Sequence, residues 1–313
     1  MTGAFSVGGV IDLPPGAPAK GTLVFSHANG FPAGTYRRLF QIWQAAGWRV
    51  VAVERYGHDP AFPVTSNWPR LRDQLIAVVD ARVDARTNEG NDGNEANEGN
   101  RGNNAYGRRG PVFLVGHSLG GYLSLLAACR RRDLAQGVVL LDSPVVAGWR
   151  AHGVQVAKAT GLIKRVSPGR VSQTRRHHWP SAPEALKHFA AKSMFARWDA
   201  EVLADYIRAG TEADPDLGGV RLAFDRAVET RIYNTLPHHF GTLLQRHPPA
   251  CPVHYLGGTR SSEGRQVGMA MTRALTKGRI GWLEGSHLYP MERPDDTARA
   301  VLDVLNDLSQ TPS

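Results

Sequence analysis

The residues best suited to do chemistry in this chain are a serine held between glycines and a histidine near the carboxyl end. Ser118 is the central residue of a Gly-x-Ser-x-Gly pattern at residues 116–120. A serine hydroxyl is a weak nucleophile at neutral pH, and it needs a base within hydrogen-bonding reach and a third group that orients the base. His287, in Gly-Ser-His at residues 285–287, is the candidate base. The two residues predict nucleophilic attack on a substrate by Ser118.

The segments on either side of Ser118 predict a strand, a tight turn and a helix. Residues 112–115 form a short apolar run, and apolar residues recur at helical spacing over residues 119–132. Such a turn holds its central residue in a strained conformation, so glycine is needed where side chains would collide with the neighbouring strand and helix. The serine hydroxyl would then stand clear of the sheet edge, above the positive end of the helix.

Short apolar strands alternate with helical patterns along most of the chain. This rhythm predicts an α/β fold with a mostly parallel, twisted sheet and helices on both faces. Ligands bind at the carboxyl ends of the strands in such sheets, which is where Ser118 and His287 fall. The expected strands cover residues 21–26, 49–54, 112–115, 137–142, 252–257 and 279–283.

The rhythm stops between residues 144 and 250, where helices are predicted over 182–198, 200–209 and 220–233. We expect this segment to be a helical lid inserted after the strand that follows the nucleophile helix. The core would then consist of residues 1–143 and 251–313. The aromatic side chains of the lid favour a partly apolar substrate pocket. Residues 87–109 are rich in Asn, Gly and Glu, and they predict a disordered surface insertion.

The composition excludes several other classes of protein. The net charge of +9 is scattered along the chain, without the basic face that nucleic-acid binding needs. The chain has only two cysteines, far apart, which argues against a disulfide scaffold or a cysteine zinc site. The paired histidines match no metal signature, and we expect neither a metal nor a cofactor. No leader-like start or membrane-length apolar run is visible, so a soluble cytoplasmic protein without integral membrane association is expected.

Four segments together resemble the α/β-hydrolase superfamily, in its branch of lid-bearing serine esterases and lipases. They are residues 116–121 around Ser118, the loop at 27–32, the turn at 55–59 and Gly-Ser-His at 285–287. The resemblance implies that Ser118 attacks the carbonyl of a small ester-like substrate while His287 takes its proton and later returns it to the leaving group. It also implies an oxyanion hole formed by the backbone amides of Leu119 and Asn29. A shift of one residue in the loop would make Gly30 the second donor.

The orienting acid is where the chain departs from the family pattern. An aspartate is expected near residues 261–262, after the penultimate strand, but both positions are serine. Glu263 follows directly and has a longer side chain, so it is the preferred candidate. Asp142, after the strand that follows the nucleophile helix, is the alternative, although it could equally buttress the turn before Pro144. The missing aspartate also motivates a second hypothesis, a non-catalytic ligand-binding or interaction protein with the same fold.

Overall fold

The structure is a computed structural model that describes residues 9–16, 18–84, 110–145, 169–264 and 268–310. The predicted low-complexity insertion at 87–109 lies outside the described residues. The predicted lid is described at residues 144–145 and again from residue 169 onward.

The core of the protein is a seven-stranded sheet that is mostly parallel, as predicted. Among the described strands of this sheet, only β1 runs antiparallel to its neighbour, β3. The inner strands are buried along their whole length, because helices cover both faces of the sheet. In spatial order the strands are β1 (Val10–Leu13), β3 (Trp48–Val53), β2 (Gly21–Ser26), β4 (Val112–His117), β5 (Gly137–Leu141), β9 (Val253–Gly258) and β10 (Ile280–Leu283).

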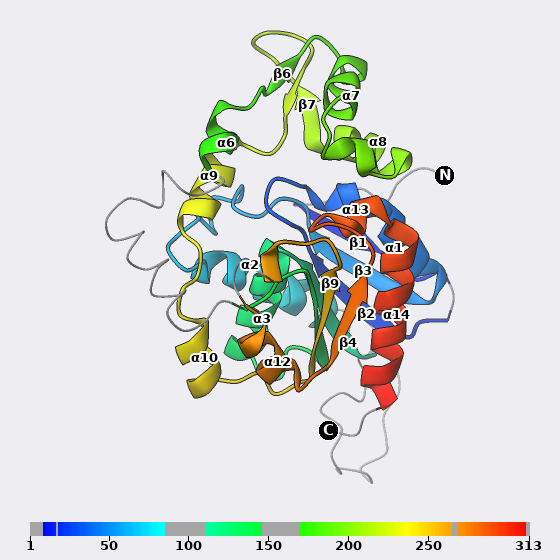
Figure 1. Ribbon diagram of the computed structural model, residues 1–313, viewed down its shortest axis with the longest axis vertical. Coiled ribbons are helices and arrows are strands. Elements are labelled where there is room, and N and C mark those ends of the chain that lie inside the picture. The colour runs from blue at the N-terminus through cyan, green and yellow to red at the C-terminus, as the bar shows by residue number, and fades with distance from the viewer. Residues whose placement is uncertain (1–8, 17, 85–109, 146–168, 265–267, 311–313) are drawn as a thin grey trace, which may run out of the picture.

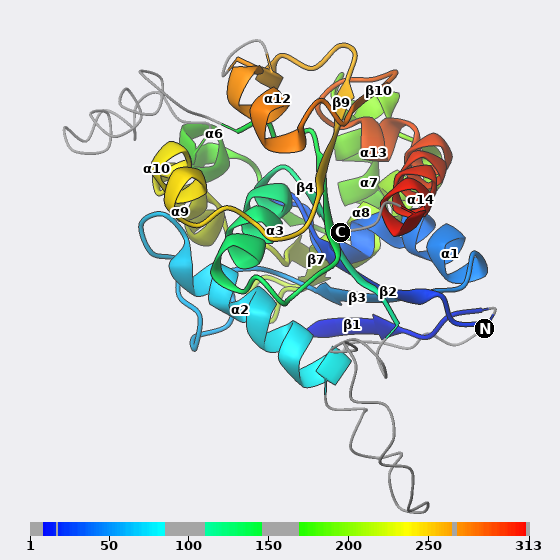
Figure 2. The same ribbon diagram turned by 90° about the horizontal axis from the view of Figure 1, so that it is seen from below.

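Alternate residues of each strand enter two separate hydrophobic clusters, one on each face of the sheet. On β2, Leu23 and Phe25 pack on one side and Val24 on the other. Figure 2 shows the helices that cover these faces. No helix in the described part of the chain is long and apolar enough to cross a membrane. One face carries α1 (Arg37–Ala45) and α14 (Pro294–Gln310), and the other carries α2 (Pro69–Val79), α3 (Leu119–Arg130) and α12 (Ala270–Thr276).

Residues 169–250, which we call the insertion, lie in the chain between β5 and β9 and form helices and a small sheet. Figure 1 shows α7, α8, β6 and β7 together at one end of the molecule. Two short helices, η1 (Ala33–Tyr36) and α13 (Tyr289–Glu292), belong to the core. The elements of the insertion are α6 (Gly169–Thr174), β6 (His178–Trp179), α7 (Ala182–Ala190), η4 (Phe195–Arg197), α8 (Ala200–Gly210), β7 (Thr211–Ala213), β8 (Val220–Leu222), α9 (Arg226–Asn234) and α10 (Phe240–Arg246).

The insertion contains strands as well as the predicted helices, because β6, β8 and β7 form a three-stranded antiparallel sheet. The helix predicted over 220–233 is in fact the strand β8 followed by α9. Gly218 and Gly219 have φ values of +69° and +73°, which reverse the chain between β7 and β8 and allow them to pair. Asp225 then begins α9, since its carboxylate accepts hydrogen bonds from two backbone N–H groups of the first turn.

The insertion contacts the loops at the carboxyl ends of the parallel strands. In the loop after β2, Asn29 Nδ2 donates to the backbone oxygen of Glu229 at 3.1 Å. In the turn after β3, His58 Nε2 accepts from the backbone N–H of Asp225 at 2.9 Å. Both contacts are made by residues at or in α9, so this helix lies over the sheet edge where the predicted site residues gather.

Candidate active site

Ser118 occupies the sharp turn between β4 and α3. Its φ and ψ values are 53° and −113°, a conformation that L residues rarely adopt. The Ser118 N–H donates to the backbone oxygen of Leu141, the last residue of β5, at 3.0 Å. The turn therefore fixes the serine at the carboxyl edge of the sheet, as the sequence pattern predicts.

The glycines beside Ser118 are required by close backbone packing. A Cβ atom at Gly116 would overlap the backbone of Gly120, the second residue of α3. A Cβ atom at Gly120 would overlap the backbone oxygen of Ser26, at the end of β2. These contacts hold α3 against the sheet, and they confirm the steric reason inferred for the two glycines.

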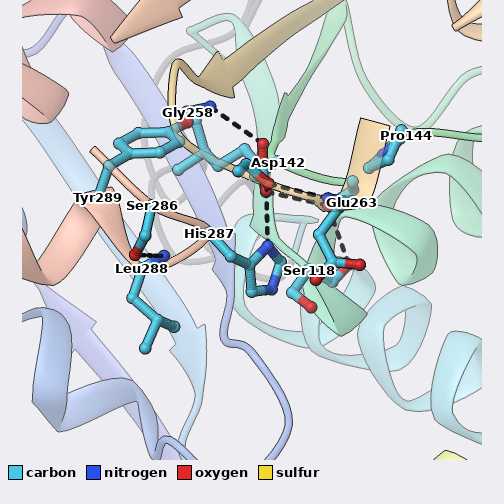
Figure 3. A network of polar contacts seen from close by, with 12 residues as sticks. Ser118, Asp142, Pro144, Gly258, Glu263, Ser286, His287, Leu288 and Tyr289 are labelled. Atoms are coloured by element: carbon cyan, nitrogen blue, oxygen red, sulfur yellow. Dashed lines mark hydrogen bonds and ion pairs between the residues drawn. The ribbon is translucent and has the colours of Figure 1, made fainter. Parts of the chain in front are cut away.

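Asp142 and His287 form the central polar contact of the site. His287 Nδ1 lies 2.6 Å from Asp142 Oδ2. Figure 3 shows the His287 ring between the Asp142 carboxylate and Ser118. Asp142 directly follows β5, and His287 lies in the loop after β10. Three loops at the same edge of the sheet thus bring a serine hydroxyl, an imidazole and a carboxylate together.

The Asp142 carboxylate is buried and has four hydrogen-bond donors, so its charge is well stabilised. Burial alone would raise the pKa of Asp142, but the bonds to His287 and other donors outweigh it and hold the pKa below its ordinary value. Oδ1 accepts from the hydroxyl of Tyr255 and the N–H of Gly258, and Oδ2 accepts from the hydroxyl of Ser261 and from His287.

The contact with Asp142 sets the protonation of His287. A carboxylate only accepts hydrogen bonds, so Nδ1 carries the hydrogen and Nε2 of the neutral ring has a free lone pair. Burial would lower the pKa of His287, but the hydrogen bond and charge of Asp142, helped by the charge of Glu263, raise it above its ordinary value. The ring is therefore arranged to accept a proton at Nε2.

The structure corrects the preference for Glu263 as the carboxylate behind His287. Asp142 holds that position, while Figure 3 shows the Glu263 side chain extending from its loop toward Ser118. The serine at 261, where the family pattern has an aspartate, donates its hydroxyl to Asp142 instead. Glu263 lies beyond this serine, and its backbone N–H donates to the Ser261 hydroxyl at 3.2 Å.

Sequence reasoning missed the donors that support Asp142. Tyr255 and Gly258 belong to β9, the strand next to β5, and they reach the carboxylate only because these strands are neighbours. One local feature accompanies this arrangement: Asp142 has a φ of 45°, a strained value for a residue with a side chain. The conformation turns the chain sharply at the end of β5.

The two candidate oxyanion donors are the backbone N–H groups of Leu119, which directly follows Ser118, and of Asn29, in the loop after β2. The N–H of Leu119 is the first of α3, and the first N–H groups of a helix have no partner within it. Asn29 lies in a tight turn closed by the Phe31 N–H, which donates to the backbone oxygen of Ala28 at 3.1 Å. Gly30 has a φ of +81°, as a type II turn requires at its third residue.

Comparison with known proteins agrees with this arrangement. A sequence model of the alpha/beta hydrolase family matches residues 23–300. A monoglyceride lipase from Rattus norvegicus is 26% identical over 155 residues, which cover 50% of this chain and 45% of the lipase. The chain is thus matched to less than half of that relative's length.

Two solved structures share the fold across nearly the whole chain. E-2-(acetamidomethylene)succinate hydrolase has a TM-score of 0.67 at 19% identity, covering 95% of this chain and 94% of its own. A thioesterase domain from the curacin biosynthetic pathway has a TM-score of 0.66 at 19% identity, covering 95% and 97%. At this level of identity the likeness concerns the fold.

Proposed function

Since the chain belongs to the alpha/beta hydrolase family, we propose that it is a serine hydrolase that cleaves a carboxylic ester through an acyl-enzyme. The substrate would be a small, partly apolar ester. The observation that carries the proposal is the 2.6 Å contact between His287 Nδ1 and Asp142, with the His287 ring next to Ser118. This contact supplies the oriented base that a serine nucleophile needs.

In the proposed first step, Ser118 Oγ attacks the ester carbonyl carbon and His287 Nε2 takes the hydroxyl proton. Asp142 stays ionised and stabilises the imidazolium that forms. The tetrahedral intermediate then collapses, the bond to the leaving alcohol breaks, and His287 gives the proton to the alcohol oxygen. The acyl group remains on Ser118 as an ester.

In the second step, water replaces the alcohol. His287 takes a proton from water as the water oxygen attacks the acyl carbon. Collapse of the second intermediate breaks the bond to Ser118 Oγ, which recovers the proton from His287. The products are a carboxylic acid and the free enzyme, so atoms and charges balance over the cycle.

The developing oxyanion would be bound by the backbone N–H groups of Leu119 and Asn29. Leu119 begins the helix after β4, and Asn29 lies in the loop after the neighbouring parallel strand β2. Removal of one such donor typically raises the barrier by about 3 kcal/mol. The type II turn at residues 28–31 gives the second donor a fixed backbone, because Gly30 adopts its positive φ without strain.

The insertion would act as the lid and make the surroundings of the site apolar. Phe31, in the loop after β2, packs against Trp198 and Tyr206 of the insertion with ring centroids 5.5 Å and 5.7 Å away. This largely buried aromatic cluster beside the proposed oxyanion loop gives the site an apolar surrounding, which favours an apolar acyl or alcohol group over a strongly charged one. The likeness to a monoglyceride lipase supports the same class of substrate.

Turnover of a p-nitrophenyl acyl ester by the wild-type protein and by Ser118→Ala tests this proposal. We expect the variant to lose nearly all activity, and equal turnover by both proteins would overturn the assignment. Labelling by a fluorophosphonate probe separates an active serine hydrolase from a binding protein with the same fold. Labelling of the wild type that is absent in Ser118→Ala would exclude a non-catalytic binding protein. That alternative was suggested by the absence of an aspartate near residues 261–262.

A further inference from the structure

A buried chain of hydrogen bonds runs beneath the nucleophile, from the loop after β2 to the loop that carries His287. The backbone N–H of Ala28 donates to the hydroxyl of Tyr36 at 3.2 Å. That hydroxyl lies 2.7 Å from His117 Nδ1. His117 Nε2 lies 2.9 Å from the backbone oxygen of His287. The side chains of Tyr36 and His117 are both almost completely buried.

Only one arrangement of hydrogens satisfies this chain. A backbone oxygen only accepts, so His117 Nε2 must carry a hydrogen and donate it to His287. Burial lowers the pKa of His117 to about 3, so the ring is neutral and Nδ1 has a lone pair. Nδ1 therefore accepts from the Tyr36 hydroxyl, whose oxygen in turn accepts from Ala28. Every bond points in the same direction, from the oxyanion loop to the histidine loop.

His117 connects these hydrogen bonds to the nucleophile because of its position in the sequence. His117 is the last residue of β4 and directly precedes Ser118. Its ring bonds on one side to the loop of the base and, through Tyr36, on the other side to Ala28, which directly precedes Asn29. One buried side chain thus joins the three segments that carry the nucleophile, the base and the second oxyanion donor.

We propose that His117 and Tyr36 are positioning residues that fix the oxyanion loop and the His287 loop relative to Ser118. The inference rests on the proposed serine hydrolase function. Neither side chain is exposed to substrate, so both act through the backbone of other residues. Because a displacement of about 1 Å of a reacting group can cost about 100-fold in rate, breaking the chain should lower kcat and leave KM nearly unchanged.

Tyr36→Phe is the sharpest test, because it removes one hydroxyl and keeps the ring. Tyr56→Phe is a matched control: Tyr56 is also buried, and its hydroxyl contacts the Ser26 hydroxyl at 2.8 Å. We expect Tyr36→Phe to lower kcat about 10-fold with KM within about two-fold, while Tyr56→Phe keeps kcat within about two-fold. Both should melt at a similarly reduced temperature. Equal kcat values in the two variants would mean that these hydrogen bonds have a structural role alone, and they would overturn the proposal.

The two hydrogen bonds of the His117 ring can be removed separately by substitution. In His117→Gln the amide N–H can take the place of Nε2 and donate to His287, whereas in His117→Asn the amide oxygen can take the place of Nδ1 and accept from Tyr36. We expect Gln to lower kcat without moving the pH profile. The Asn variant should lower kcat and also shift the pH profile, because it loses the hydrogen bond to the backbone oxygen of His287 and so frees the loop that holds His287 against Asp142. Wild-type kcat and pH profile in both variants would overturn the proposal.

The rate of fluorophosphonate labelling keeps this test separate from the proposed substrate class. A wild-type protein that labels at Ser118 but hydrolyses no nitrophenyl ester would contradict the ester assignment, and the labelling rates of Tyr36→Phe and Tyr56→Phe would still decide the positioning role. A wild-type protein that neither labels nor hydrolyses would overturn both proposals.

Discussion

His287 Nδ1 and Asp142 Oδ2 lie 2.6 Å apart although 145 positions separate the two residues in the chain. The sheet order explains their meeting. Asp142 directly follows β5 and His287 follows β10, and only β9 lies between these two strands. β9 also supplies the hydroxyl of Tyr255 and the N–H of Gly258 to the carboxylate. The contact is therefore a product of strand order rather than of any local sequence pattern.

Asp142→Asn should lower kcat by about 10⁴-fold, because an amide no longer fixes the tautomer of His287 or stabilises its charged form. Glu263→Gln is the matched variant, and we expect its kcat to stay within about 10-fold of wild type, since Glu263 does not hold His287 Nδ1. Ester hydrolysis at saturating substrate measures both. A loss in Glu263→Gln as large as that in Asp142→Asn would contradict this assignment.

The pH dependence should follow His287, which must be neutral to act as a base. Its pKa is raised above the ordinary 6.5, so kcat/KM should rise with pH and reach half its plateau above 6.5. The negative charge of Glu263 contributes to this increase. Glu263→Gln should therefore shift the midpoint toward lower pH. A pH series of kcat/KM for both proteins checks the direction, and a shift toward higher pH would refute it.

Asn29→Pro should remove the proposed oxyanion donor while keeping the turn. Asn29 is the second residue of the type II turn, where proline is well tolerated. Asn29→Ala is the control, because it loses the same bond to Glu229 but keeps the backbone N–H. We expect kcat of the proline variant to fall about 100-fold or more below that of the alanine variant. Similar kcat values would exclude Asn29 and leave Gly30 as the candidate.

Stability should fall in mild acid, in part because of His117. Its folded-state pKa is about 3 and its ordinary value is 6.5, so the unfolded chain binds the extra proton between these pH values. The contribution of the neutral ring is complete above pH 6.5 and is lost as the pH falls toward 3. At pH 5 the loss is about 2 kcal/mol.

Urea unfolding at pH 7 and pH 5 measures this effect. His117→Gln should be less stable than wild type at pH 7, yet lose about 2 kcal/mol less between the two pH values. His247→Gln changes an exposed histidine and is the control, which should keep the wild-type loss. An unchanged loss in His117→Gln would show that His117 does not stay neutral in the fold.

The sequence predicts the sheet because its inner strands are continuous apolar runs separated by helical patterns. It also predicts Ser118 and His287, since each follows a strand and lies in a recognisable local pattern. The choice between Glu263 and Asp142 depends instead on which strands are neighbours. A carboxylate one residue beyond the expected position looked adequate in sequence, but the loop presents Ser261 to Asp142 and directs Glu263 toward Ser118.

The small sheet of the insertion was missed for a different reason. β6, β7 and β8 contain only two or three residues each, too few for a period-two pattern to be distinguished from a helical one. Their pairing depends on the turn at Gly218 and Gly219 and on contacts between segments far apart in the chain. Such short strands are defined by their partners rather than by their own residues.

The positive φ of Ser118 also bears on any attempt to improve this protein. Glycine would adopt φ 53° without the strain that serine carries there, so Ser118→Gly would relax the backbone while removing the proposed nucleophile. Directed evolution that selects for heat resistance alone would thus reward an inert variant at this position. A screen for more heat-resistant variants must measure turnover as well as thermal stability, because at Ser118 the residue that favours stability removes the proposed activity.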